Sequence, residues 1–325
     1  MSRPNILSTH PLFPEARAAL DAHCDVEYWS RPDRPSRAEF LKQVAPKDGV
    51  VCLLTEKIDK EMLATAPKLK IAANVAVGYD NITVPDCTAR KVAVSNTPGV
   101  LDETTADFAW TLLMTVARRV GEGEDLARSG KWAGWNLDEL CGGDVWGKTL
   151  GVIGFGRIGK AVARRSRGFG MKVIYTDAIR APESAEAELG ARFVDMDALF
   201  AESDFVTVHV PFMAGTHHLI SAARLKQMKR TAYLINTARG PVVDNEALYE
   251  ALKAGTIAGA GLDVHEQEPK IHAGLVSLKN TVLTPHIASA SLETRTKMAV
   301  MAAENVVAFF AGRRPPNILN PEVLG

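Results

Sequence analysis

The amino-acid sequence predicts an α/β fold with two doubly wound parallel sheets. At 325 residues the chain is long for a single hydrophobic core, so two domains are expected. Short β-rich runs alternate with amphipathic helical stretches, which is typical of βαβ units and parallel sheets. The alternation occurs in two series that are separated near Pro98–Gly99. Each series therefore predicts one domain.

The first series covers the first hundred residues and ends at a long helix. Residues 102–129 have Ala, Leu, Met and Val at helical spacing and predict one continuous helix, which Asp102 is placed to cap. Five strands are expected before it: 5–9, 25–29, 49–54, 69–75 and 92–96.

The second series begins at Lys148 and stops near His286. One amphipathic helix follows and ends at Gly312. This helix is expected to return to the first domain, so that a cleft lies between the two domains at the carboxyl ends of the strands. The expected strands lie within 148–156, 172–177, 191–195, 204–210, 232–237, 257–264 and 281–286.

Composition excludes several classes of protein. Hydrophobic residues make up 46% and charged residues 23% of the chain, an ordinary globular balance. Lys plus Arg equals Asp plus Glu, at 38 each, so no nucleic-acid or membrane partner is expected. The four cysteines are scattered without a CxxC pair, as in reduced cytosolic proteins. The N-terminal residues lack the apolar core of a signal peptide, so a cytoplasmic location is expected.

A glycine motif gives the first indication of function. Gly154-x-Gly156-x-x-Gly159 follows an apolar strand and opens a helical run. The first glycine permits a tight turn, the second lets the backbone approach a pyrophosphate, and the third lets helix and strand pack closely. The N-terminus of the helix then presents free N–H groups to phosphates. This context predicts a Rossmann domain that binds a dinucleotide.

An acidic residue ends the next strand. Asp177 lies 18 positions after Gly159, close to the spacing of about 20 at which an acid binds the adenosine ribose. Its carboxylate would accept hydrogen bonds from the ribose hydroxyls and repel a 2′-phosphate. The alternative is an ordinary turn residue. NAD(H) is therefore the preferred cofactor, while Arg180, three residues later, leaves NADP(H) open as an alternative.

Three residues that suit proton and carboxylate chemistry follow strands of the second series: Arg239, Glu268 and His286. Each alone has an ordinary explanation as a surface arginine, a loop glutamate or a packed histidine. Together they lie on the sheet edge that carries the glycine motif. Arg239 suits a substrate carboxylate and keto oxygen, while His286 suits proton transfer at C2. Glu268 would hold the imidazole and favour its protonated form, and nicotinamide would supply the hydride.

The order of these motifs resembles the D-isomer-specific 2-hydroxyacid dehydrogenase family. GFGRIG, Asp177, HVP, NTARG, GLDVHEQEP and TPHIASAS occur in that family's order, and the resemblance covers essentially the whole chain. It implies that Arg239, Glu268 and His286 are the catalytic set of an NAD(P)-dependent dehydrogenase. It also implies a split, flavodoxin-like substrate-binding domain, 1–98 with 288–325, into which a Rossmann domain, 99–287, is inserted.

The resemblance implies roles for further residues. VAVGYDNI matches the loop whose backbone N–H groups, here those of Val77 and Gly78, bind the substrate carboxylate; the alternative is a plain strand-to-helix turn. Leu53 and Trp135 join Arg239 and His286 as substrate-binding positions. The cofactor-binding positions are Thr104, Gly154, Phe155, Gly156, Arg157, Ile158, Gly159, Asp177, His209, Val210, Pro211, Thr216, Thr237, Ala238, Arg239, Asp263, His286 and Ala288.

Within the family, WGKTLGVIGFGRIG and GLDVHEQEP are most similar to glyoxylate and hydroxypyruvate reductases. The expected reaction is reduction of a small 2-oxo acid to the D-2-hydroxy acid, with the proton from His286. D-lactate, phosphoglycerate and phosphite types stay open as alternatives, whereas formate dehydrogenases carry Gln in place of Glu268. The loop after the histidine is commonly Ile-Gly-Ser-Ala in the family, and Ala288 is expected to narrow the space beside the nicotinamide.

Partners follow from the same resemblance. Trp135 falls where some of these reductases place a Trp that reaches a neighbouring subunit's active site; the alternative is packing in a dimer arm, and both imply a homodimer. A non-catalytic NAD(H)-sensing corepressor is the alternative of a different class, disfavoured because no extended disordered or basic segment is present. No metal site is expected, because His209, His217 and His218 have no acidic partner at ligand spacing.

Overall fold

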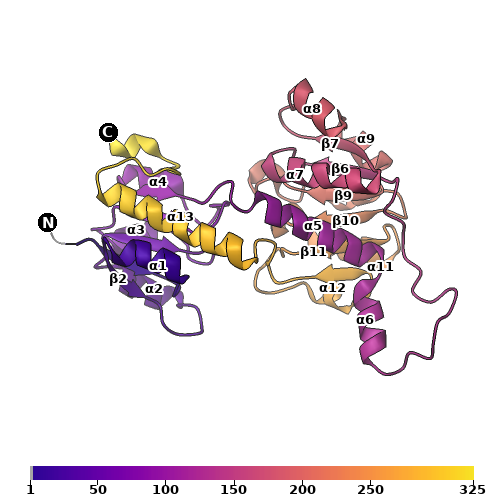
Figure 1. Ribbon diagram of the computed structural model, residues 1–325, viewed down its shortest axis with the longest axis horizontal. Helices are drawn as coiled ribbons and strands as arrows, with labels where there is room; N and C mark the ends of the chain where they lie inside the picture. The colour runs from indigo at the N-terminus through magenta and orange to yellow at the C-terminus, as the bar shows by residue number, and fades with distance from the viewer. Residues whose placement is uncertain (1–2) are drawn as a thin grey trace. The chain divides into compact units, whose positions relative to one another are not determined.

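The computed structural model describes residues 3–325. The chain forms two compact units, Met1–Leu101 with Ala290–Gly325, and Asp102–Ser289. Both contain a wholly parallel sheet with helices on its faces, which confirms the predicted fold class (Figure 1). Within residues 3–325, no helix combines the length and the apolar composition that crossing a membrane requires.

The first unit is built on a five-stranded sheet of order β2-β1-β3-β4-β5, the flavodoxin-like arrangement. Its strands are β1 (Asn5–Ser8), β2 (Asp25–Tyr28), β3 (Gly49–Cys52), β4 (Ile71–Asn74) and β5 (Ala93–Ser95). Its helices are α1 (Pro14–Asp21), α2 (Arg37–Val44), α3 (Lys60–Thr65), α4 (Val84–Ala89) and α13 (Leu292–Phe310), followed by the 3-10 turn Pro321–Leu324.

The last helix of the chain completes this unit. α13 lies along α1 and covers β3 and β4, although almost the whole chain separates α13 from α1 (Figure 1). Its alanines, such as Ala299 and Ala303, let it pack closely against Leu20 and Ile71 in one apolar layer. The opposite face of the sheet is covered by α2, α3 and α4. Residues after the second series are therefore required for the core of the first unit.

The second unit is built on a seven-stranded sheet of order β12-β11-β10-β9-β6-β7-β8. Counted from β6, this is the Rossmann order with one added strand, and the order reverses between β6 and β9. The strands are β6 (Thr149–Ile153), β7 (Lys172–Thr176), β8 (Ala191–Phe193), β9 (Phe205–Val208), β10 (Tyr233–Asn236), β11 (Gly259–Leu262) and β12 (Thr281–Leu283). The helices are α5 (Asp102–Ala117), α6 (Val120–Arg128), α7 (Arg157–Ser166), α8 (Glu183–Leu189), α9 (Met196–Glu202), α10 (Ala222–Leu225), α11 (Asn245–Lys253) and α12 (Ala273–Ser277).

The central strands of this sheet, β6, β9, β10 and β11, are buried on both faces, so neighbouring side chains enter different cores. In β10, Ile235 packs with α5 and α7, whereas Leu234 packs on the other side with α9, α10 and α11. This explains why the strands appear in the sequence as continuous apolar runs rather than as alternating patterns. The sheet is thus a fixed platform for the loops at its carboxyl edge.

The prediction of one helix over 102–129 is wrong, because α5 ends at Ala117 and α6 begins at Val120. Arg119 between them has a left-handed backbone, with φ of 52°. The carbonyl of Ala117 accepts a hydrogen bond from Gly143 N at 2.8 Å, which caps α5 from a distant segment. This contact with a distant segment cannot be predicted from the helical spacing of apolar residues in 102–129. Asp102, expected to precede the helix as its cap, is its first residue.

Candidate active site

The glycine motif forms the turn between β6 and α7. Gly154 has φ of 90°, and a Cβ there would lie 2.8 Å from the carbonyl carbon of His209. A Cβ on Gly159 would lie 2.1 Å from the oxygen of Gly154, so only glycine lets the helix sit this close. Gly156 is the N-cap of α7, and a Cβ on it would meet nothing within 4 Å. The first N–H groups of α7 thus face a side-chain-free cradle that fits a pyrophosphate.

Asp177 is fixed against this turn. Its Oδ2 accepts a hydrogen bond from the backbone N–H of Phe155 at 2.6 Å, which holds the carboxylate at the end of β7 where a ribose would bind. Arg180 has another partner, because its guanidinium forms two hydrogen bonds with Glu186 at 2.9 and 2.8 Å. That pairing lowers the pKa of Glu186 to about 2. The cation nearest in sequence to Asp177 is therefore paired with Glu186, an acid of the following helix α8.

Arg157 and Thr104 lie at the starts of two neighbouring helices. Arg157 opens α7, and its Nε lies 3.1 Å from Oδ2 of Asp102, the first residue of α5. Thr104 is half-buried in the first turn of α5, and Ile158 is half-buried in that of α7. The contact joins the glycine-rich turn to the start of the helix that opens this unit.

The loop after β9 carries the next group of predicted residues. His209 N donates to the carbonyl of Ile153 at 2.7 Å, and the imidazole Nε2 lies 2.8 Å from the hydroxyl of Thr207. Burial lowers the pKa of His209 to about 3, so its ring is neutral at physiological pH. Further along, the hydroxyl of Thr216 donates to the carbonyl of Pro211 at 2.7 Å and closes the loop. The ring of His209 is therefore not protonated for proton donation at physiological pH, and its role beside a cofactor stays a prediction.

His286 and Glu268 lie in contact at the carboxyl edge of the sheet. Nδ1 of His286 is 2.9 Å from Oε2 of Glu268, and Oε1 of Glu268 accepts the backbone N–H of His265 at 3.0 Å. Partial burial disfavours the carboxylate, but the hydrogen bond and charge of His286 outweigh it, so the pKa of Glu268 lies below its ordinary value. An ionised Glu268 holds Nδ1 and leaves Nε2 of His286 for a substrate.

The backbone of His286 is held in a left-handed conformation, with φ of 56°. Its N–H donates to the carbonyl of Asp263 at 2.8 Å. The buried carboxylate of Asp263 accepts the N–H groups of Ile287 and Ala288 at 2.8 and 2.7 Å, and the hydroxyl of Thr284 at 2.6 Å. A non-glycine residue keeps such a backbone only where its surroundings enforce it. Asp263 therefore fixes the loop that aims His286.

Arg239 lies on a turn after β10 that the side chain of Asn236 fixes by hydrogen bonds. The buried side chain of Asn236 donates to the carbonyl of Arg239 at 3.0 Å and accepts the N–H of Ala238 at 3.0 Å. Gly240 follows, and a Cβ there would lie 2.0 Å from the carbonyl carbon and oxygen of His265. The Arg239 turn is thus packed directly on the loop that carries Glu268. Nη1 of Arg239 also donates to the carbonyl of Ala238 at 2.8 Å.

Two buried polar atoms beside these residues have no hydrogen-bond partner within residues 3–325: Oγ1 of Thr237 and Nδ1 of His265. A buried polar atom of this kind has a hydrogen bond to give to a group that the chain does not supply, such as a water or a ligand. The predicted cofactor position Thr237 therefore fits a bound polar ligand. The sequence does not identify His265 as a site residue, because its contact with Glu268 is made by its backbone N–H. Its Nε2 lies 2.9 Å from the carbonyl oxygen of Thr284.

Residues 110–288 match the family described as D-isomer specific 2-hydroxyacid dehydrogenase, NAD binding domain. This range includes the glycine turn, Arg239, Glu268 and His286, and makes up more than half of the chain.

The chain belongs to the D-isomer-specific 2-hydroxyacid dehydrogenases.

Relatives of this dehydrogenase match it along its whole length. Glyoxylate reductase of Korarchaeum cryptofilum is 50% identical over 99% of this chain and 97% of its own. Glyoxylate reductase of Thermococcus litoralis is 48% identical over 99% of this chain and 98% of its own. Among solved structures, the NADPH-dependent glyoxylate/hydroxypyruvate reductase of Sinorhizobium meliloti, in complex with NADP and malonate, is 33% identical with a TM-score of 0.86, covering 98% of each chain. The protein is therefore an oxidoreductase that uses a nicotinamide cofactor.

The predicted substrate loops of the dehydrogenase lie at the ends of β3 and β4 in the first unit. Leu53 N donates to the buried carboxylate of Glu56 at 2.8 Å. The carbonyls of Val77 and Gly78 accept hydrogen bonds from the side chains of Asn96 and Asn74, both at 2.8 Å. These asparagines fix the orientation of the loop. Binding of a substrate carboxylate by the N–H groups of Val77 and Gly78 stays a prediction.

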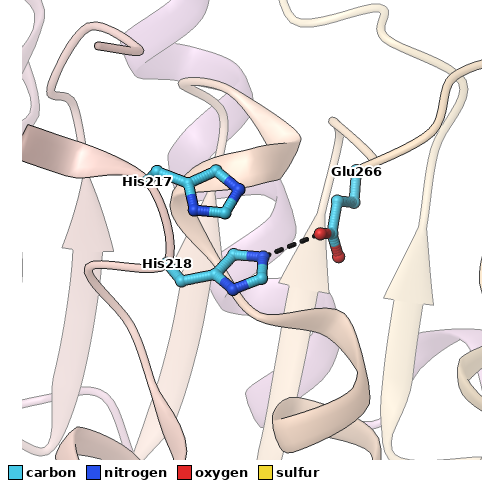
Figure 2. A group of neighbouring side chains, drawn as sticks. All are labelled: His217, His218 and Glu266. Atoms are coloured by element: carbon cyan, nitrogen blue, oxygen red, sulfur yellow. Dashed lines mark hydrogen bonds and ion pairs between the residues drawn. The ribbon is translucent and has the colours of Figure 1, made fainter. Parts of the chain in front are cut away.

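One expectation about histidines is wrong. The sequence shows no acidic residue near His217 and His218, yet Nε2 of His218 lies 2.7 Å from Oε1 of Glu266 (Figure 2). Asp244 Oδ2 lies 3.8 Å from Nδ1 of the same ring. Glu266 lies 48 positions after His218, and the two residues are brought together because β9 and β11 belong to the same parallel sheet. Short-range ligand spacing in the sequence cannot predict such a contact.

Proposed function

We propose that this dehydrogenase reduces glyoxylate or hydroxypyruvate to the corresponding D-2-hydroxy acid with NADH. The observation that carries the proposal is the 2.9 Å contact between His286 and Glu268, whose own loop is packed against the Arg239 turn. A histidine held by a carboxylate beside an arginine is the set that reduction of a 2-oxo acid needs. The names of the full-length relatives support glyoxylate as the substrate.

In the proposed mechanism Arg239 orients the substrate and His286 donates a proton to its keto oxygen. Arg239 binds the carboxylate and the keto oxygen with its planar guanidinium and thereby orients C2. His286, with Nδ1 held by Glu268, donates the proton on Nε2 to the keto oxygen as charge develops there. Glu268 stabilises the imidazolium before transfer and keeps the remaining proton on Nδ1 afterwards. A nicotinamide cofactor held at the glycine turn would supply the hydride to C2.

A panel of 2-oxo acids tests the proposal. NADH oxidation at 340 nm is followed with glyoxylate, hydroxypyruvate, pyruvate and phosphohydroxypyruvate, each with NADH and with NADPH. We expect the highest kcat/KM with glyoxylate or hydroxypyruvate. Equal or higher kcat/KM with pyruvate or phosphohydroxypyruvate contradicts the substrate assignment, and oxidation with none of them favours a non-catalytic NAD(H)-binding protein.

Asp177→Ala is expected to relax the preference for NADH over NADPH by about tenfold or more, because one hydrogen bond to a charged group contributes about 1.5–3 kcal/mol. The substitution removes the acceptor for the ribose and the repulsion of a 2′-phosphate. The ratio of kcat/KM values for the two cofactors measures the change. Asp195→Ala, which removes the N-cap of α9 on the same unit, is the control. An unchanged ratio in Asp177→Ala contradicts the ribose contact.

We further propose that the enzyme is a homodimer. Three large apolar side chains in the segment after α6 are strongly exposed: Trp132 at 59%, Trp135 at 82% and Leu137 at 78%. Such a concentration of exposed apolar surface is typical of a protein interface. Light scattering is expected to give twice the chain mass of 35.1 kDa. A monomer at micromolar concentration contradicts the proposal and the role of Trp135 in a neighbouring active site.

A cytoplasmic location is also part of the proposal. Cys24, Cys52 and Cys87 are buried free thiols, and burial raises the pKa of Cys24 to about 11 and that of Cys87 to about 12. Unpaired cysteines of this kind support a reducing compartment. Cell fractionation with immunodetection tests the location, and recovery in a secreted fraction contradicts it.

A further inference from the structure

We propose that His217, His218 and Glu266 form a binding site for one divalent cation of the zinc class. One nitrogen from each imidazole and one carboxylate oxygen lie within 4.8 Å of one another. Figure 2 shows the two rings lying one above the other with the carboxylate of Glu266 facing them. Within residues 3–325 this is the one group of three or more such ligands that are this close together.

The three ligand atoms are close enough to share an ion, but one imidazole has to rotate, because the two rings are stacked at 3.9 Å and their nitrogen lone pairs lie in nearly parallel planes. Zinc binds nitrogen and oxygen ligands at about 2.0–2.2 Å, so two ligands of a tetrahedral ion lie about 3.3 Å apart. His218 Nε2 and Glu266 Oε1 are closer than this, at 2.7 Å, because a proton joins them. Binding replaces that proton with the ion, and the pair opens by a fraction of an ångström. The exposed side chain of His217 moves to supply the third ligand.

Neighbouring groups support the first ligands as they do in metal sites. The distal Nδ1 of His218 faces Oδ2 of Asp244 at 3.8 Å, and ligating histidines typically present their other nitrogen to a carboxylate. Glu266 Oε2 accepts the backbone N–H of Asn245 at 3.3 Å, which orients the carboxylate. Both contacts come from the start of α11, where Asp244 is the N-cap and Asn245 is the first residue of the helix.

The backbone beneath the cluster is fixed. His218 has a left-handed backbone with φ of 49°, and its N–H donates to the carbonyl of Pro241 at 2.9 Å. Glu266 lies where the close approach of Gly240 fixes the chain, since a Cβ on Gly240 would lie 2.5 Å from Glu266 N. A bound ion therefore ties the loop after β9 to the loop after β11. One of its ligands, Glu266, lies two residues before Glu268 on the same loop.

The ligand set identifies the class of ion. Two imidazole nitrogens and one carboxylate favour Zn²⁺, Ni²⁺ or Cu²⁺, whereas Mg²⁺ and Ca²⁺ prefer oxygen ligands only. With three protein ligands, the fourth position is completed by water. The site is separate from the proposed proton donor, because neither His286 nor Glu268 contributes a ligand atom.

Isothermal titration of the full-length, untagged Cys141→Ser protein with ZnCl₂ tests the site. Cys141 is replaced because it is the exposed thiol among the cysteines and would bind zinc by itself. We expect one Zn²⁺ per chain, a rise in melting temperature on loading, and no comparable effect of MgCl₂. His217→Ala and Glu266→Gln, each in this background, are expected to weaken Zn²⁺ binding by at least about tenfold.

A matched pair elsewhere in the unit provides the control. Nε2 of His272 lies 2.9 Å from Oε2 of Glu246, the same contact without a second imidazole. His272→Ala is expected to leave the Zn²⁺ affinity unchanged. His217 is exposed, so its replacement tests binding without disturbing the core, and an unchanged NADH affinity verifies the fold. Zn²⁺ binding that is absent, or equally strong in His217→Ala and Glu266→Gln, overturns the proposal.

Discussion

His286→Ala is expected to lower kcat for glyoxylate reduction by about 10²- to 10⁴-fold, the contribution of a positioned general acid. The substitution removes the imidazole that Glu268 holds at 2.9 Å, and with it the Nε2 proton that the proposed mechanism transfers. Cofactor affinity is expected to change little, because the glycine turn and Asp177 lie on other loops. Steady-state kinetics with glyoxylate and NADH measure kcat, and quenching of tryptophan fluorescence measures the dissociation constant of NADH.

Two variants separate the proton transfer from the effects of packing. Glu268→Gln keeps the size of the side chain but removes its charge, so kcat is expected to fall by less than in His286→Ala. His272→Ala removes a histidine that also pairs with a glutamate, Glu246, and is expected to leave kcat unchanged. A His286→Ala enzyme that retains most of its kcat contradicts the role of His286 as proton donor.

The sequence predicts those parts of the site that depend on local chemistry. The glycine turn is recognisable because two close approaches within six residues, at Gly154 and Gly159, each require the absence of a side chain, and Gly156 leaves the cradle open. Arg239, Glu268 and His286 are recognisable because each follows an apolar run, and parallel strands bring their carboxyl ends to one edge. The strands themselves are found with small errors at their ends, since continuous apolar runs mark a sheet that is buried on both faces.

Contacts between distant segments are not expressed in the sequence. The break between α5 and α6 depends on Gly143, which occupies the carbonyl of Ala117 from 26 positions away. The carboxylate beside His218 comes from Glu266, 48 positions later. No short-range spacing of residues around the histidines predicts this contact. The role of Asp263 is similar, because its three hydrogen bonds to the His286 loop form only when β11 and β12 pair.

The Asp263 contacts also bear on Ala288. Its N–H donates to Asp263 at 2.7 Å and its side chain is buried. Asp263 therefore holds the backbones of Ala288 and His286 together. The expectation that the methyl of Ala288 narrows the space beside the nicotinamide stays a prediction, which the relative rates with glyoxylate and the larger hydroxypyruvate test.

Arg239→Lys is expected to lower kcat/KM for glyoxylate by about 10- to 100-fold. An ammonium carries the same charge but cannot form two parallel hydrogen bonds in one plane, and each charge-assisted bond contributes about 1.5–3 kcal/mol. The turn itself is expected to stay intact, because Asn236 holds it through the backbone carbonyl of Arg239 and the N–H of Ala238.

The kinetic constants for glyoxylate distinguish a substrate role from a structural one. If Arg239 binds the carboxylate and the keto oxygen, KM rises and kcat falls together in Arg239→Lys, while the NADH affinity and the melting temperature remain near those of the wild type. Arg230→Lys, at an exposed arginine of the same unit, is the matched control and is expected to change none of them. A wild-type kcat/KM in Arg239→Lys shows that a point charge suffices at this position, and the planar two-bond recognition of the substrate is then wrong.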